Sequence, residues 1–190
     1  MLNKLSDFFW NIADWKTFLL GFILYMIFGG YIMPQGVRMF QEVSGKSDVQ
    51  VMDLQFCYSP EKARSIIGDY GHEGRTLAVK FGLIADTVYP MAYTFYFIII
   101  LTWILKGLSA YGVRYKHVHL FPLLILLIDY CENINLANLF RTYPNFSDMQ
   151  VYIASFFTSL KWSLVGVLAV LILCALIWLL QKKLSKAPVV

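Results

Sequence analysis

Four long apolar runs alternate with polar segments along the chain, at about residues 17–33, 81–105, 118–140 and 150–180. The fourth run contains nineteen consecutive residues without a charge, from Trp162 to Leu180. A helix of that length rises about 30 Å at ~1.5 Å per residue, which matches the hydrocarbon thickness of a bilayer. Backbone N–H and C=O groups in lipid must pair within the segment, so each run is expected to be a helix. The pattern predicts an all-α integral membrane four-helix bundle.

The loop between the first two runs (34–80) carries signals of its own structure. The segment VQVMDLQF (49–56) alternates enough to indicate a short extended stretch. Ser59 is placed to cap a helix that has Pro60 at its first position. From His72 the chain is expected to run as helix straight into the second span. We therefore expect a structured extracytoplasmic loop, with a short amphipathic helix lying over the outer mouth of the bundle.

The composition fits a single transmembrane domain over residues 1–190. Apolar residues make up 58% of the chain, whereas soluble domains are nearer 45–50% apolar. The first span is expected to end at Pro34, and no repeat or low-complexity segment is present. The three cysteines form no CxxC motif and are expected to be small apolar fillers, and no cleavable signal peptide is expected at the N-terminus.

The connecting segments differ in charge, which predicts an orientation. The N-terminus, the 106–117 loop and the C-terminal tail together carry eight basic residues and two acidic ones, whereas the 34–80 loop carries six of each. The positive-inside rule then places both termini in the cytoplasm and the long loop outside. We expect an integral protein of a bacterial inner membrane. Its basic residues are scattered, so membrane lipid rather than nucleic acid is the expected partner.

Ionisable residues interrupt the apolar runs at four positions. Asp86 lies in the second run, Asp129 and Glu132 lie in the third, and Lys161 lies in the fourth, while Asp53 precedes them in the loop. A charged group within a membrane span costs several kcal/mol unless it faces a partner, a cavity or a ligand. The sequence therefore predicts a polar site inside the bundle.

In the second span, polar and aromatic residues share one helical face. Asp86, Tyr89, Pro90 and Tyr93 recur at helical spacing. Pro90 has no backbone N–H, so it should kink the helix and free a carbonyl near Asp86.

In the third span, Asp129, Glu132 and Asn133 stand at i, i+3 and i+4 and so share a face. Asp129 and Lys161 each lie sixteen residues from a turn near residue 145, which predicts an ion pair between them. The same argument places Asp86 level with residue 137 and near Glu132 and Asn133. Arg75 and His72 are expected to approach from the outer side.

The sequence argues against several classes of enzyme and metal site. His72 belongs to the outer loop, while His117 and His119 belong to the opposite end of the third span. One monomer therefore cannot bring all three histidines to one zinc ion across ~30 Å. No GxSxG, phosphate-loop or dinucleotide motif is present. No metal or cofactor is predicted.

The organisation resembles the emopamil-binding-protein (EXPERA) superfamily, whose members are four-helix membrane proteins that bind or isomerise sterol-like molecules. The shared features are the four spans, the long first loop with Met52-Asp53-Leu54-Gln55, and a second span in which Asp86 precedes Pro90. The resemblance implies that Asp86 contacts a ligand amine or a developing cation and that Asp53 supports the pocket entrance. The histidine-and-glutamate pair of the family's isomerases has no clear counterpart here, so the resemblance supports a pocket more than isomerisation.

The leading hypothesis is binding of a lipid-like or amphiphilic small molecule in an acidic, aromatic-lined cavity, with proton-transfer chemistry permitted but not required. The residues expected to line that cavity are Asp86, Tyr89, Tyr93, Asp129, Glu132 and Asn133. Supporting roles are expected for Asp53, Arg75 and Lys161. The alternatives are a membrane scaffold or assembly protein whose polar network is purely structural, and a proton or cation conductor. Whether the protein is an enzyme, and its oligomeric state, are left open.

Overall fold

The computed structural model describes residues 1–112 and 117–185, and all regular secondary structure among them is helical. Within these residues, four helical segments are long and apolar enough to cross a membrane: Trp15–Ser44, Gly71–Ser109, Val118–Thr142 and Asp148–Leu184. The predicted all-α fold with four candidate spans is confirmed.

The helices are longer than the predicted spans. The elements are, in chain order, α1 (Leu2–Ile12), α2 (Trp15–Ile27), the π-helical turn η1 (Phe28–Ile32), α3 (Met33–Ser44), the 3₁₀ turn η2 (Met52–Leu54), α4 (Pro60–Asp69), α5 (Gly71–Ser109), the 3₁₀ turn η3 (Val118–Leu120), α6 (Pro122–Thr142) and α7 (Asp148–Leu184). With 39 residues, α5 extends about 58 Å, well beyond one hydrocarbon thickness.

The first helical segment does not stop at Pro34, where the sequence analysis expected the span to close, but continues to Ser44. A widened turn, η1, precedes the proline, and the N–H of Met33 bonds to the carbonyl of Phe28, five residues back. The α-helix restarts with Pro34 in its first turn, where a missing N–H costs no hydrogen bond. The segment continues as α3 to Gly45, whose φ of 68° ends it in the left-handed region.

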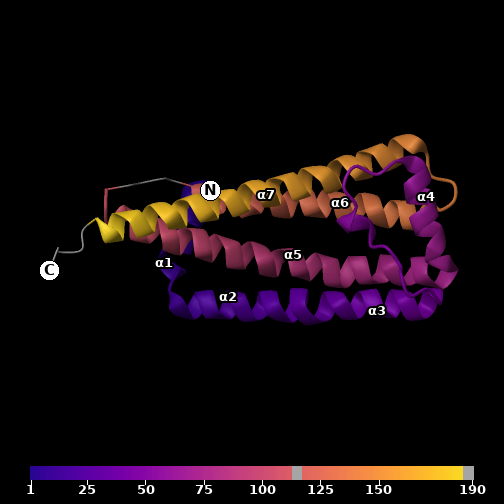
Figure 1. Ribbon diagram of the computed structural model, residues 1–190, viewed down its shortest axis with the longest axis horizontal. Coiled ribbons are helices and arrows are strands. Elements are labelled where there is room, and N and C mark those ends of the chain that lie inside the picture. Colours follow the sequence, from indigo (N-terminus) through magenta and orange to yellow (C-terminus); the bar gives the residue numbers. More distant parts are fainter. Residues whose placement is uncertain (113–116, 186–190) are drawn as a thin grey trace.

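The long helix α5 is the centre of the arrangement (Figure 1). The continuous segment α2–η1–α3 lies along one side of it, and α6 and α7 lie on the other. Three glycines, Gly21, Gly29 and Gly36, form the contact face of the first segment. An added Cβ would lie 3.2 Å from the backbone of α5 at the first, 2.9 Å from the Tyr89 hydroxyl at the second and 2.3 Å from the Phe81 ring at the third. Glycine is needed there because the helices approach too closely for a side chain.

The outward faces of the first and last segments are apolar, which fits a lipid surround. Exposed large apolar side chains recur along both helices; they include Leu19, Leu20, Ile23, Ile27, Val170, Leu173, Ile177 and Leu180. Such an extended apolar exterior is unusual for a soluble protein and normal for a membrane-spanning one.

The helix α4 lies across one end of the long helices (Figure 1), and we call this the cap end. As predicted, the Ser59 side chain accepts a hydrogen bond from the N–H of Lys62, and Pro60 opens the helix. Its inner face buries Ile66 and Ile67 in an apolar core shared with α6 and α7. The 49–56 segment is only partly extended, because the turn η2 interrupts it.

The end away from α4 is closed by the amphipathic helix α1. The Trp10 ring lies 6.0 Å from the imidazole of the buried His119, and the Lys106 ammonium donates to the carbonyl of Ala13 at 2.7 Å. His119 is thus part of the packing between α1, α5 and η3.

Candidate functional site

A buried ion pair connects α6, α7 and the loop turn η2. The Lys161 ammonium of α7 lies 2.5 Å from Oε2 of Glu132 on α6 and 3.9 Å from Oδ2 of Asp53 in η2. Glu132 is 0% exposed and Lys161 is 6% exposed. Burial removes the water around both ions, which is costly. The attraction between the two charges offsets that cost because they lie close together.

The predicted Asp129–Lys161 ion pair is wrong by one helical turn. Side chains on a helix lean toward its N-terminus. Since α7 begins at the cap end, the long side chain of Lys161 leans toward that end. Glu132 lies one turn nearer the cap end than Asp129, so Glu132 receives the ammonium.

Asp129 is instead held by neutral donors. The Tyr93 hydroxyl of α5 donates to Oδ2 at 2.6 Å, and Asn133 Nδ2 donates to Oδ1 at 3.0 Å. Both carboxylate oxygens of this 6%-exposed residue therefore accept a hydrogen bond. Asp129 and Asn133 were predicted to share a face of the third span, and the hydrogen bond between them confirms this.

The carbonyl freed by Pro90 is satisfied from the neighbouring helix. Asn133 Nδ2 donates to the Asp86 carbonyl at 2.9 Å, which is the carbonyl that residue 90 would have used. The Tyr130 hydroxyl donates to the carbonyl of Thr87 at 3.0 Å. The expected free carbonyl near Asp86 is present, and it joins α5 to α6. Asn133 meets both acceptors because an amide nitrogen carries two hydrogens.

A cavity of about 60 Å³ lies beside this polar network, between η2, α3, α5 and α6. Its polar lining includes the carboxyl groups of Asp53 and Asp86 and the amide of Asn133, and its aromatic lining consists of Phe40, Tyr70 and Phe140. That volume holds on the order of a few water molecules, whereas sites for drug-sized ligands enclose about 300–1,000 Å³. The cavity therefore fits a headgroup and not a whole amphiphile.

The two carboxyl groups that line the cavity are short of hydrogen-bond donors. Asp53 Oδ1 is buried without a donor, and no donor to the Asp86 carboxylate is found among residues 1–112 and 117–185. The backbone of Asp53 is fixed nonetheless, because Trp162 Nε1 donates to its carbonyl at 2.7 Å. The cavity thus presents acceptors that lack a partner.

The tyrosines of the loop bring hydroxyl groups close to the network. The Tyr70 hydroxyl donates to the carbonyl of Gln50 at 3.1 Å. Burial, followed by the negative charges of Asp53 and Asp86, raises the pKa of Tyr70, and burial likewise raises the pKa of Tyr58. Both side chains therefore remain neutral hydroxyls across the physiological range.

Of the six residues expected to line the cavity, Asp86 and Asn133 do so, whereas Tyr93, Asp129 and Glu132 belong to the neighbouring polar network and Tyr89 lies further away. Tyr89 is in an aromatic stack between α2 and α5, with its ring 6.3 Å from that of Tyr25 and 5.4 Å from that of Tyr93. Arg75, for which a supporting role was expected, lies with its guanidinium 4.5 Å above the ring of Tyr143, outside the cavity lining. A direct role for either residue in ligand contact stays a prediction.

The three rings of the cavity were not among the predicted site residues. Phe40 belongs to α3, Tyr70 precedes α5 and Phe140 is near the end of α6. Their ring centroids are 5.4 Å apart for Phe40 and Tyr70 and 5.0 Å apart for Tyr70 and Phe140. Only the extension of the first helix past Pro34 brings Phe40 to this place, and nothing in the local pattern signals that extension.

Comparison with known proteins does not identify a function, so the functional argument rests on the site. No family model matches the chain, and no curated protein and no solved structure matches it either. The resemblance to the emopamil-binding-protein superfamily is thus supported at the level of four membrane spans alone. Among the residues that the structure describes, no three His, Cys, Asp or Glu side chains are arranged to hold a metal ion.

Proposed function

We propose that the protein binds an amine-bearing amphiphile, with the cationic group of the ligand in the cavity beside Asp53 and Asp86. The observation that carries the proposal is an imbalance of charge at positions that are buried, for Asp129, Glu132 and Lys161, or half-buried, for Asp53 and Asp86. Four carboxyl groups, those of Asp53, Asp86, Asp129 and Glu132, accompany a single ammonium, that of Lys161. Uncompensated negative charge is costly when it is withdrawn from water, and a bound cation or protons would offset it.

The shape and lining of the cavity favour an organic cation. An ammonium group is about the size of a water molecule, so a volume of about 60 Å³ accommodates it. Aromatic faces attract cations by about 0.5–2 kcal/mol each when water is excluded. Rings on the walls and carboxylates without donors are the combination that recognises an alkylammonium group.

The apolar part of such a ligand must leave the cavity toward lipid. Gly82 and Ala137 line the wall on the side of α5 and α6, and neither has a side chain long enough to close it. An added Cβ at Gly82 would meet only Asp86 Oδ2, at 3.8 Å. We propose that the alkyl chain passes between these two residues. The resemblance to the emopamil-binding-protein superfamily also implies that Asp86 contacts a ligand amine.

A purely structural role for the polar network is the second candidate. The observation that favours it is the pair of hydrogen bonds from Asn133 and Tyr130 to carbonyls beside Pro90, since these bonds satisfy the backbone without any ligand. Ion conduction has less support. Apolar clusters that include Leu101, Ile125 and Leu168 fill the interior between the network and the end opposite the cap.

We also propose the orientation with the cap end outside the cell and both termini in the cytoplasm, on the charge asymmetry of the connecting segments. Cys57 provides a test because it lies in the loop and is exposed, whereas Cys131 and Cys174 lie within candidate spans. A membrane-impermeant maleimide should label Cys57 in intact cells. Labelling that requires permeabilised cells contradicts this orientation.

The ligand proposal is tested by thermal unfolding of the protein in nanodiscs with decylamine and with decanol. A ligand at 100 times its Kd stabilises by about 2.7 kcal/mol, so decylamine should raise the unfolding temperature by several degrees. Decanol, which has the same chain without the charge, should leave it unchanged. Asp86→Asn should abolish the decylamine effect, while the matched control Asp7→Asn, on the exposed face of α1, should retain it. Equal shifts with the amine and the alcohol, or a shift that survives Asp86→Asn, would refute the proposal.

A further inference from the structure

A second site is formed by an open groove at the cap end, on the outer side of α5 and α6. The groove has a volume of about 520 Å³ and lies between the first turns of α5 and the end of α6. Three cationic side chains line it: Arg75, Lys80 and Arg141. It is distinct from the acidic cavity, although Phe140 contributes to the walls of both.

The cations of the groove have no acidic partners. No carboxylate lies within 4 Å of Arg75, Lys80 or Arg141 among the residues that the structure describes. At the same end of the molecule, Lys46 pairs with Asp69, and Arg64 pairs with Asp148 at 2.8 Å. The three cations of the groove therefore differ from the neighbouring cations at this end, which are paired with carboxylates.

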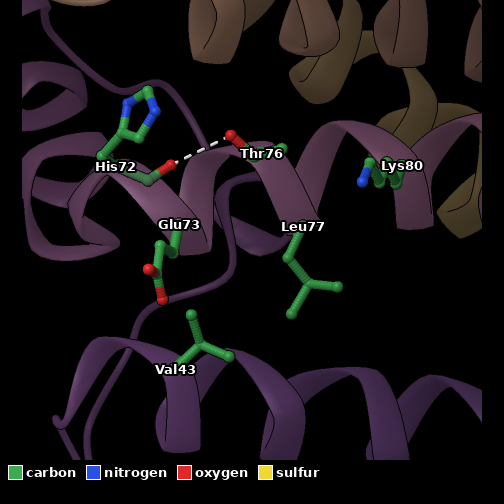
Figure 2. A pocket seen from close by; sticks show the side chains of 6 residues that line it. All are labelled: Val43, His72, Glu73, Thr76, Leu77 and Lys80. Atoms are coloured by element: carbon green, nitrogen blue, oxygen red, sulfur yellow. Dashed lines mark hydrogen bonds between the residues drawn. The ribbon is translucent and has the colours of Figure 1, made fainter.

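The nearest acid on α5, Glu73, lies on a different face of the helix from Arg75, although it shares a face with Lys80. Figure 2 shows Glu73 and Leu77 pointing toward α3, while His72 lies on the opposite edge of the helix. Glu73 lines a smaller depression of about 380 Å³ on the α3 side, which shares His72, Thr76 and Lys80 with the basic groove, but Glu73 is absent from the lining of the groove itself. The positive charge of the groove is thus not offset from within its own lining.

Arg75 stacks on an aromatic ring. Its guanidinium lies 4.5 Å above the ring of Tyr143, which also lines the groove. A stacked guanidinium keeps the N–H groups along its edge available, and that planar edge matches the oxygens of a phosphate. The arrangement provides a preformed donor for an oxyanion.

The groove changes from charged to apolar along its length. Arg75, Val79 and Leu83 stand at i, i+4 and i+8 on one face of α5, and all three line the groove. Of these lining residues Leu83 is 63% exposed, and beyond the groove the surface stays apolar, with Ile84 of α5 70% exposed and Ile134, seven residues before Arg141 on the same face of α6, 71% exposed. A polar head and an apolar tail would each meet a matching surface here.

The cations of the groove lie at or beside the ends of candidate membrane spans. Lys80 directly precedes the apolar run that begins at residue 81, and Arg141 directly precedes the last residue of α6. Basic residues at the ends of membrane spans meet the headgroup layer, where each attracts anionic lipid.

We propose that this groove binds an anionic phospholipid, with the phosphate beside Arg75 and Arg141 and an acyl chain along Leu83 and Ile134. Lys80 adds a third positive charge at the boundary between the headgroup and the chain. The site requires both parts of the ligand, so a free phosphate ion satisfies only half of it. The proposal does not depend on the acidic cavity, and Asp86→Asn should leave this binding unchanged.

The test is native mass spectrometry of the delipidated protein in neutral detergent, titrated with dioleoyl phosphatidylglycerol and with dioleoyl phosphatidylcholine. The double variant Arg75→Gln/Arg141→Gln is compared with Arg38→Gln/Lys62→Gln, which removes the same charge from exposed positions outside the groove. We expect the wild type and the control to bind the anionic lipid about tenfold more tightly than the zwitterionic one, and the groove variant to lose that preference. An equal loss in the control, or no preference in the wild type, would overturn the proposal.

Two further arms keep the result interpretable. Titration with inorganic phosphate and with glycerol 3-phosphate distinguishes the sources of the anion, and binding as tight as that of the lipid would overturn the lipid assignment. Because Arg75 stacks on Tyr143, the double variant is checked for folding by its unfolding temperature. If it is unfolded, Lys80→Gln takes its place, with a severalfold loss of lipid preference expected and an unchanged preference counting against the site.

Discussion

The ion pair of Lys161 and Glu132 allows a quantitative prediction about stability. Replacing Lys161 with methionine keeps an unbranched side chain only one atom shorter and removes its charge. Glu132, which is 0% exposed, then keeps its carboxyl group without a cation, and Asp53 loses its more distant contact. We expect Lys161→Met to destabilise the protein strongly.

The magnitude follows from the distance and the burial. Two unit charges 2.5 Å apart attract by roughly 7 kcal/mol at an effective dielectric constant of about 20, and the cost of desolvating both ions offsets part of that attraction. Removing one partner of a buried pair costs about 3–5 kcal/mol, because the remaining ion is uncompensated. Removing both charges should cost much less, so Lys161→Met/Glu132→Gln should recover most of the loss.

The assay is unfolding of the purified protein by SDS in mixed micelles, followed by tryptophan fluorescence. The control is Lys183→Met, an exposed lysine in the last turn of the same helix, which should change the unfolding free energy by less than about 0.5 kcal/mol. A single variant within 1 kcal/mol of wild type, or a double variant as unstable as Lys161→Met, would refute the reasoning.

Three other substitutions test the remaining packing and the cavity. Asn133→Ala removes the donor to the carbonyl freed by the proline of α5 and should cost about 1–3 kcal/mol in the same assay, whereas Asn135→Ala, which loses a bond within its own helix, should cost under about 1 kcal/mol. Gly36→Ala places a Cβ 2.3 Å from an aromatic ring of α5 and should cost about 1–3 kcal/mol, while Gly166→Ala, which meets open space, should be neutral or stabilising. Gly82→Leu should fill the wall of the acidic cavity and abolish stabilisation by decylamine while preserving the fold; retained stabilisation would exclude the proposed exit route.

Much of the fold follows from local patterns in the sequence. The apolar runs are long enough to identify four spans, and the Ser59-Pro60 pair identifies the start of α4. The role of Pro90 was also accessible, because a missing N–H always leaves a carbonyl one turn earlier. These features depend on residues that are close in sequence.

The features that sequence analysis missed depend on three-dimensional geometry. The partner of Lys161 was assigned by counting residues from the turn, which ignores the lean of the side chains toward the helix N-terminus. The end of the first helical segment was misplaced because a π-helical turn precedes Pro34 and lets the helix restart with the proline in its first turn. Phe40 and Tyr70 reach the acidic cavity only because that helix continues and the loop folds back, so the aromatic lining was not predictable from spacing.

The central claim is that a cationic headgroup lies between the carboxyl groups of Asp53 and Asp86 and the rings of Phe40, Tyr70 and Phe140. The most direct measurement is photo-crosslinking in nanodiscs with an alkylamine that carries a diazirine next to the amine, followed by peptide mass spectrometry. The account predicts labels on the peptides that contain these five residues, lost on competition with decylamine but not with decanol. Labels spread along the lipid-facing residues of α7, with no competition by decylamine, would contradict it.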